Sequence, residues 1–204
     1  SNGRCVFCGA TSIKYQRGLD LETYAYEFIH IFEPEELFEM KFDVIIGNPP
    51  YHLNVGVEKE NYAVPIFQNF VEQAKKLKPK FLIMITPSRW FTGGRGLNSF
   101  RQEMLSDARL KTIVDFPNSQ ECFPGVDISG GVSYFFWSRE YFGPCEFVSI
   151  NNGIKKISMR KLDEFPILLR YNEALSIIHK VLAKKEKTLD TIVSQQTPFG
   201  LIST

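Results

Sequence analysis

The sequence predicts an α/β fold built on one open, largely parallel sheet. Three short apolar runs, 42–46, 81–85 and 110–116, have the length and the β-branched content of strands. Residues 65–78 carry apolar side chains at helical spacing, and a second helix is predicted at 97–106. Strands that alternate with helices at this spacing are typical of βαβ crossovers.

Composition sets the outer limits. With 204 residues, 44% of them hydrophobic and 23% charged, the chain can bury one sizeable core. No apolar run is long enough to cross a bilayer, so no membrane partner is expected. The formal net charge of +1 neither favours nor excludes a nucleic-acid partner. Because no secretory segment opens the chain, we expect a cytoplasmic protein whose four cysteines are reduced thiols.

The N-terminal segment, residues 1–40, contains half of a zinc-binding pattern. Cys5 and Cys8 are spaced so that both thiolates could bind one tetrahedral ion, but no second pair of ligands lies nearby. Zinc ligands and ordinary thiols therefore both stay open. Alternating aromatic residues predict a strand over 24–31, and a proline in the first turn predicts a short helix over 33–38.

The run Phe42 to Ile46 ends at Gly47, and we expect this strand to be buried on both faces of the sheet. Asn48-Pro49-Pro50-Tyr51 then lies where the strand leaves the sheet, the edge at which open α/β folds bind ligands. Two prolines fix the backbone and leave the carbonyl oxygens without strand partners. An Asn oxygen and a proline carbonyl can accept both hydrogens of an exocyclic amine, while a tyrosine stacks on the ring that carries it. This pattern predicts methylation of a planar amino group.

This stretch resembles the Asn-Pro-Pro-Tyr motif of methyltransferases that use S-adenosylmethionine, above all DNA adenine-N6 methyltransferases such as the Eco57I-like restriction-modification methylases. The resemblance implies a Rossmann-like methyltransferase sheet and double-stranded DNA as partner. It implies that Asn48 and Pro49 bind the adenine amine, that Tyr51 stacks on the flipped base, and that Asn48 and Pro50 lie beside the cofactor. No metal is required, because the sulfonium is already a good leaving group.

Residues 52–61 are predicted to form a polar loop before the helix at 65–78. In the family an aromatic residue near this helix start forms a wall for the cofactor. Phe70 matches that position best and Phe67 is the second choice, although either ring could instead be plain core. Gly93 to Gly96 lacks the frame of a phosphate-binding loop and predicts a turn.

A long loop follows the strand at 110–116, and a further apolar strand is predicted at 131–137. In the adenine methyltransferases the loop between these strands supplies an aromatic residue that packs against the flipped adenine. Phe123 matches that position, and it is therefore a predicted substrate-binding residue. The alternative is that Phe123 only fixes the loop to the core.

The rest of the chain predicts an edge strand at 145–150, a turn, and a helix at 171–184. We therefore divide the chain into the N-terminal segment (1–40), the catalytic half of a methyltransferase domain (41–150) and a helical C-terminal extension (151–204) leading toward a target-recognition domain. The glycine-rich cofactor loop of this fold is absent before residue 40.

The sequence therefore predicts an inactive portion of a longer methylase, with a partial sheet that begins at 42–46. The open edge of that strand should self-associate or be covered by an N-terminal segment.

Three other functions stay open. The motif also occurs in enzymes that methylate glutamine side chains or guanine in RNA. The missing cofactor loop is compatible with a non-catalytic scaffold or DNA-contact module. The third alternative is a nucleotide-binding α/β domain unrelated to methylation.

Overall fold

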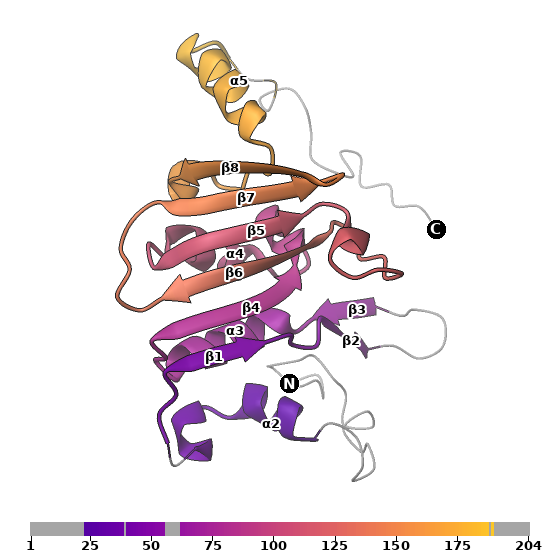
Figure 1. Cartoon of the computed structure of the whole chain (residues 1–204), viewed down its shortest axis with the longest axis vertical. Coiled ribbons are helices and arrows are strands. Elements are labelled where there is room, and N and C mark those ends of the chain that lie inside the picture. The colour runs from indigo at the N-terminus through magenta and orange to yellow at the C-terminus, as the bar shows by residue number, and fades with distance from the viewer. Residues whose placement is uncertain (1–22, 39, 56–61, 188, 190–204) are drawn as a thin grey trace. The chain divides into compact units, whose positions relative to one another are not determined.

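The computed structural model describes residues 23–38, 40–55, 62–187 and 189. The chain divides into two compact units, 1–170 and 171–204. The first unit is built on a six-stranded sheet with the order β1-β4-β6-β5-β7-β8, and strands β2 and β3 form a separate pair (Figure 1).

The elements have the following bounds. The strands are β1 (Val44–Gly47), β2 (His52–Val55), β3 (Tyr62–Pro65), β4 (Phe81–Pro87), β5 (Leu110–Phe116), β6 (Val132–Ser138), β7 (Cys145–Asn151) and β8 (Ile154–Arg160). The α-helices are α2 (Thr23–His30), α3 (Phe67–Lys76), α4 (Asn98–Ser106) and α5 (Asn172–Ala183). Short 3-10 turns are η1 (Pro34–Leu37), η2 (Ser88–Phe91), η3 (Ser119–Glu121) and η4 (Leu162–Glu164).

The predicted βαβ crossover is confirmed. β1 pairs in parallel with β4, with Val44 opposite Phe81, and α3 lies between them in sequence. β6 is antiparallel to both β4 and β5 and lies between them, while β7 runs parallel to β5. The predictions of helices at 33–38, 65–78, 97–106 and 171–184 are confirmed by η1, α3, α4 and α5, each within a few residues.

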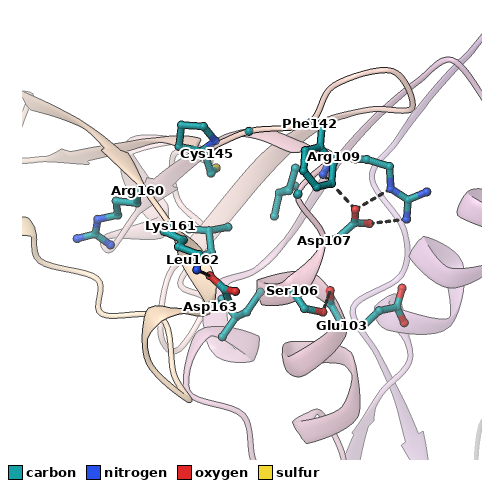
Figure 2. A pocket seen from close by; sticks show the side chains of 15 residues that line it. Glu103, Ser106, Asp107, Arg109, Phe142, Cys145, Arg160, Lys161, Leu162 and Asp163 are labelled. Atoms are coloured by element: carbon teal, nitrogen blue, oxygen red, sulfur yellow. Dashed lines mark hydrogen bonds and ion pairs between the residues drawn. The ribbon is translucent and has the colours of Figure 1, made fainter.

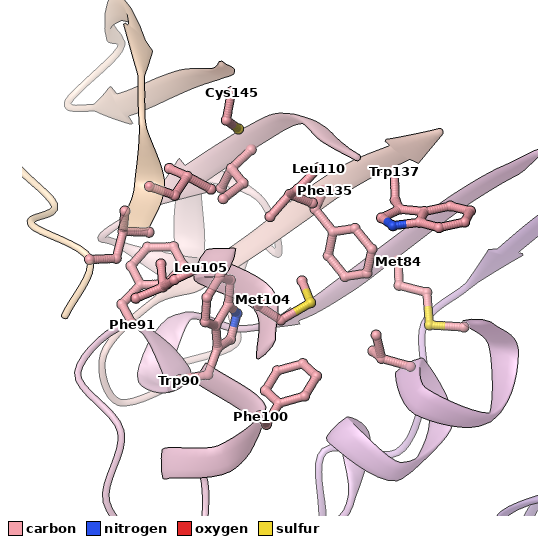
Figure 3. Packing of buried hydrophobic residues seen from close by; sticks show 14 of the residues in the cluster. Met84, Trp90, Phe91, Phe100, Met104, Leu105, Leu110, Phe135, Trp137 and Cys145 are labelled. Carbon is pink, nitrogen blue, oxygen red and sulfur yellow. The ribbon is translucent and has the colours of Figure 1, made fainter. Parts of the chain in front are cut away.

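One face of the sheet carries the hydrophobic core. In Figure 1, α3 and α4 lie behind the strands, and the aromatic residues packed between helices and sheet are drawn in Figure 3. The Trp90 and Trp137 side chains are fully buried there. The ring centroid of Trp90 lies 5.8 Å from that of Phe100 on α4, in an edge-to-face arrangement. Each such buried side chain stabilises the fold by about 1.5–3 kcal/mol.

The opposite face of the sheet is largely open. Ile46, Phe136 and Met159 lie in one cross-strand row on this face. Ile46 is 72% exposed and Met159 is 59% exposed. Among the described residues, no helix of the first unit therefore covers the apolar side chains of this row as α3 and α4 cover the core face.

The prediction that the strand at 42–46 is buried on both faces is wrong. β1 is an edge strand, and its only strand neighbour within the described residues is β4. Ile45 packs against the core, whereas Val44 and Ile46 point to the open face. An apolar run without alternation does not distinguish a central strand from an edge strand of this kind.

Residues 24–31 form helix α2 instead of the predicted strand. Tertiary contacts explain the difference. The Gln73 Nε2 atom donates hydrogen bonds to the carbonyls of Phe28 and Ile31, at 2.9 and 2.6 Å, and so satisfies the last turn of the helix. The Ile29 side chain is 1% exposed. Docking on α3 therefore overrides the alternating pattern.

Two further predictions about strands are wrong. The stretch 52–61, predicted as a polar loop, begins with strand β2, which forms a hairpin with β3 directly after that stretch; His52 pairs with Pro65. The strand at 145–151 is not an edge, because β8 pairs with it along its full length from Cys145 opposite Arg160. β8 was not predicted, since only one residue of its seven is buried. The compact first unit thus extends to residue 170, past the predicted boundary at 150.

Candidate active site

The corner after β1 is fixed at both of its ends. β1 ends at Gly47, and the chain then turns through Asn48, which is exposed, Pro49, which is buried, and Pro50, which is half-buried, to Tyr51. The Ile66 N–H donates a 3.2 Å hydrogen bond to the Tyr51 carbonyl just before α3. The corner is therefore held between the sheet and the start of a buried helix.

Two oxygens of this corner have no protein partner in the described part of the chain. The carbonyl of Pro49 accepts no backbone hydrogen bond there, and the Asn48 side chain makes none. Pro49 and Pro50 themselves offer no N–H group. Both oxygens thus lack a donor among the described residues, and Asn48 is exposed to solvent.

A pocket of about 210 Å³ lies beside the corner. It is lined by Tyr51, His52, Pro65, Phe67, Pro87, Arg89, Asp127, Ile128 and Ser129. These residues come from the corner and the start of β2, the ends of β3 and β4, η2, the start of α3 and the loop between β5 and β6. Within the described residues, the Arg89 side chain makes no ion pair or hydrogen bond. A small, mainly apolar pocket with a few polar groups is the usual form of a binding site.

Tyr51 presents a ring rather than an acid or a base. Its ring packs against the core cluster, and its hydroxyl is buried without a hydrogen-bond partner in the described residues. Burial, with a smaller contribution from nearby Cys122, raises the pKa of Tyr51 to about 12. The phenol therefore stays neutral at physiological pH, and it is suited to stacking.

Phe123 lies in the loop of residues 117–131, here called the β5–β6 loop. The loop is organised around Ser119, which is 2% exposed. The Ser119 Oγ atom accepts a hydrogen bond from the Ile128 N–H at 2.8 Å and donates one to the Val126 carbonyl at 2.9 Å. The Phe123 N–H donates to the Ser119 carbonyl at 2.8 Å. Phe123 is thus fixed in a preorganised loop, directly after the Cys122 that lies near Tyr51.

Glu121 ties the same loop to the sheet. Its carboxylate accepts hydrogen bonds from the N–H groups of Asn152 and Gly153, each at 2.9 Å, in the turn between β7 and β8. Sequence reasoning identified neither Ser119 nor Glu121. The Asn152-Gly153 turn was recognisable, but its carboxylate partner lies about thirty residues away in sequence.

The two phenylalanines considered for the cofactor wall lie in different places. Phe67, the second choice, lines the pocket beside Tyr51. Phe70 is 6% exposed and packs against Phe28 of α2, with 6.2 Å between ring centroids. The structure therefore brings Tyr51 and Phe67 together, and it places Phe70 at the contact between two helices.

A buried charged group that sequence reasoning missed lies close to this edge. Asp115 is fully buried near the end of β5 and accepts a 2.7 Å hydrogen bond from Ser88 Oγ. The Arg170 Nε atom lies 2.7 Å from Asp115 Oδ2. Burial raises the pKa of Asp115, while Arg170 and Ser88 act in the opposite direction. The sequence signal was an acid inside an apolar strand.

A larger pocket of about 730 Å³ lies at the other edge of the sheet, where β5 and β7 begin (Figure 2). Asp107 and Arg109 form an ion pair on its wall. None of its lining residues comes from the corner at 48–51. Of these two pockets, the smaller one therefore lies next to the corner at 48–51 and to the carboxyl end of β4.

The structure holds no group of three or more metal-ligating side chains among the residues it describes. Cys5 and Cys8 lie outside those residues. Across the described ranges, each helix is too short or too polar to span a bilayer.

Comparison with known proteins gives consistent matches. The sequence pattern of the Eco57I restriction-modification methylases matches residues 4–123, more than half of the chain. An uncharacterized adenine-specific methylase of Mycoplasma pneumoniae is 42% identical over 149 residues, which are 68% of this chain and 35% of the relative. The chain thus spans about a third of the length of that curated relative.

Solved structures give weaker matches. A chain of a type I restriction-modification system is 16% identical with a TM-score of 0.41, covering 78% of this chain and 34% of the other. The methyltransferase subunit of a type I system from Streptococcus thermophilus is 11% identical with a TM-score of 0.40, covering 74% and 34%.

Proposed function

Because this chain belongs to the Eco57I restriction-modification methylase family, we propose that it is the catalytic half of a DNA adenine-N6 methyltransferase. The methyl donor is S-adenosylmethionine, the partner is double-stranded DNA, and the compartment is the cytoplasm. The observation that carries the proposal is that the Asn48 side-chain oxygen and the Pro49 carbonyl have no partner among the described residues and follow one another next to Tyr51, which lines the pocket.

The corner acts on the exocyclic amine of a flipped base. The Asn48 side-chain oxygen and the Pro49 carbonyl each accept one amine hydrogen, which draws the nitrogen lone pair out of conjugation with the ring. Tyr51 stacks on one side of the base and Phe123 packs against it from the β5–β6 loop. Flipping costs a few kcal/mol, which stacking in the pocket offsets.

Part of the cofactor site fits the residues described. When bound, S-adenosylmethionine supplies an activated methyl group on a sulfonium. Asn48 and Pro50 follow β1 at the edge where this group has to approach the amine. Because Phe67 lines the pocket and the Phe70 ring packs against Phe28, we assign the proposed cofactor contact to Phe67, the second choice, in preference to Phe70.

The glycine-rich loop through which this fold holds its cofactor is not found before residue 40, so the residues of this chain supply only part of the contacts that a bound cofactor needs. We expect the 204-residue chain to bind S-adenosylmethionine weakly or not at all, and the full-length protein to bind it. Calorimetry on both measures this, and micromolar binding by the short chain would contradict the expectation.

Replacement of Asn48 tests the central assignment. In the full-length protein, Asn48→Ala should abolish transfer of labelled methyl groups to adenine in DNA. Its thermal unfolding should match wild type, because Asn48 is exposed and outside the strand. Gln102→Ala, on the exposed side of α4, is the control and should keep full activity. An Asn48→Ala enzyme that retains most of its activity removes the assignment.

The open edge of the sheet suggests how the chain associates. Val44 and Ile46 on β1 are 48% and 72% exposed, and an apolar edge strand is a template for another chain. We propose that the 204-residue chain self-associates there. In sedimentation experiments, Ile46→Lys should shift the chain toward monomer, whereas Ile154→Lys on the other edge strand should not. A wild-type chain that is monomeric at high concentration rules this out.

A further inference from the structure

A buried ion pair joins segments that are far apart in sequence. The Arg170 Nη2 atom donates a 3.1 Å hydrogen bond to Asp115 Oδ1, and its Nε lies 2.7 Å from Oδ2. Asp115 is fully buried, and the Arg170 side chain is 21% exposed. Ser88 Oγ donates to the same Oδ1 at 2.7 Å. The carboxylate therefore links the end of β4, the end of β5 and residue 170.

Arg170 reaches one step further, to the β5–β6 loop. Its Nη2 also donates a 2.5 Å hydrogen bond to the Gly130 carbonyl. The guanidinium carbon lies 5.4 Å from the centroid of the Phe91 ring, so it also stacks on an aromatic side chain. A planar guanidinium can make these contacts at once, which a lysine ammonium cannot.

Gly130 lies where the loop meets the pocket. Ile128 and Ser129, immediately before it, line the pocket beside Tyr51. The next residue, Gly131, donates through its N–H to the Ile128 carbonyl at 2.8 Å and accepts from the Ser88 N–H at 3.0 Å. The end of the loop is therefore tied to Asp115 through both Ser88 and Arg170.

The energetics of the pair favour a single loop position. An ion pair buried to this extent costs desolvation, and the pairing offsets that cost only in one geometry. Removing one partner leaves the other charge buried without compensation. A loop anchored by such a pair has few alternative arrangements that keep every charge satisfied.

We propose that Asp115 and Arg170 are positioning residues that hold the β5–β6 loop against the pocket, so that Ile128 and Phe123 meet the flipped base. We call this link between Asp115, Arg170 and the Gly130 carbonyl the clamp. The effect on methyl transfer rests on the proposed function, whereas the clamp itself does not. Loosening the loop should slow methyl transfer and leave DNA affinity unchanged, because neither Asp115 nor Arg170 is among the residues that line the pocket.

The experiment compares Arg170→Gln, Arg170→Lys and Ser88→Ala in the full-length protein. Arg109→Gln is the matched control, since Arg109 also pairs with an aspartate, Asp107, but at the opposite edge. Hydrogen exchange of peptides covering the β5–β6 loop reports the clamp. Single-turnover methyl transfer and the dissociation constant for DNA report its consequence.

For Arg170→Gln we expect loop amides to exchange about tenfold faster. Methyl transfer should slow by about a hundredfold, as for other misplaced active-site groups. The DNA dissociation constant should stay at its wild-type value. Arg170→Lys should recover part of both losses, and Ser88→Ala should show smaller effects in the same direction. Arg109→Gln should show neither effect.

Other results would overturn the clamp, the positioning role or the proposed function separately. Unchanged loop exchange in Arg170→Gln overturns the clamp, whatever the activity. Faster exchange with normal methyl transfer overturns the positioning role and leaves the proposed function standing. A wild-type enzyme that does not methylate adenine overturns the proposed function, and loop exchange still decides the clamp. If Arg170→Gln does not fold, the Arg170→Lys and Ser88→Ala variants decide by the same exchange measurement.

Discussion

The Trp137 indole donates a 2.9 Å hydrogen bond from Nε1 to Oδ2 of Asp107. The same carboxylate lies 3.1 Å from Lys75 Nζ and accepts a 2.7 Å hydrogen bond from Arg109 Nε. The Asp107 side chain is only 6% exposed. Burial alone would raise the pKa of Asp107. The contacts with Arg109, Lys75 and Trp137 outweigh burial and lower the pKa to about 2.

This shift predicts a loss of stability in acid. The folded-state pKa of Asp107 is below the unfolded value, so its contribution is present above about pH 4 and is lost as pH falls toward 2. The contribution is about 2 kcal/mol. Urea unfolding of wild type and Asp107→Asn should therefore give free energies that differ at neutral pH and converge in acid. If the difference between the two unfolding free energies did not change with pH, ionisation of Asp107 would not contribute to the stability of the fold.

Tyr51 offers a test that separates its ring from its hydroxyl. The hydroxyl is buried without a partner in the described residues, so Tyr51→Phe should leave stability unchanged or raise it by up to about 1 kcal/mol. Methyl transfer should persist. Tyr51→Ala removes stacking worth about 1–3 kcal/mol, so kcat/KM should fall by about 10- to 100-fold. An inactive Tyr51→Phe enzyme would instead assign the chemistry to the phenol oxygen.

Arg89 lines the pocket without an ion-pair partner in the described residues. We expect its guanidinium to contact a phosphate of the bound DNA. In the full-length enzyme, Arg89→Ala should reduce the slope of the logarithm of DNA affinity against the logarithm of salt concentration by about one. Lys111→Ala, at the start of β5, should leave the slope unchanged. Equal slopes for wild type and Arg89→Ala would exclude a phosphate contact.

Alanine variants at two glycines of the β5–β6 loop distinguish the effect of steric crowding on stability from the effect of backbone strain. Gly125 and Gly131 have φ angles of 80° and 81°, which an alanine adopts only with strain. A Cβ at Gly131 would lie 2.3 Å from the Phe116 carbonyl oxygen, whereas one at Gly125 would meet nothing within 4 Å. Gly131→Ala should therefore lower the melting temperature well below that of Gly125→Ala. Equal melting temperatures would mean that the loop end moves aside at little cost.

Local sequence was sufficient for the elements that depend on local chemistry. Two successive prolines define the turn after Gly47, and apolar side chains at helical spacing define helix α3. Both patterns are visible in the local sequence, so both elements could be predicted. Helix α2 could not, because the group that completes it is Gln73, more than forty residues away. β8 was missed because Lys155, Lys156 and their neighbours are exposed and show no alternating pattern.

The site divides in the same way. Asn48, Pro49 and Tyr51 are adjacent in sequence, so their common location needed no knowledge of the fold. The pairing of Asp115 with Arg170 spans 55 residues, and although Asp115 stands out as an acid in an apolar strand, no local pattern identifies Arg170 as its partner. The different locations of Phe67 and Phe70 depend on where α2 docks, and the alternating aromatic residues of 24–31 predicted a strand there instead of a helix.

The position of β6 has a consequence for synthesis on the ribosome. β6 follows β5 in sequence yet lies between β5 and β4, so these two earlier strands never pair with each other. In a nascent chain that has emerged only to Phe116, β4 and β5 therefore both lack β6, the strand with which each of them pairs. Such non-local pairing is slow. The β5–β6 loop lies inside this closing segment, so one wall of the pocket takes shape only when β6 inserts.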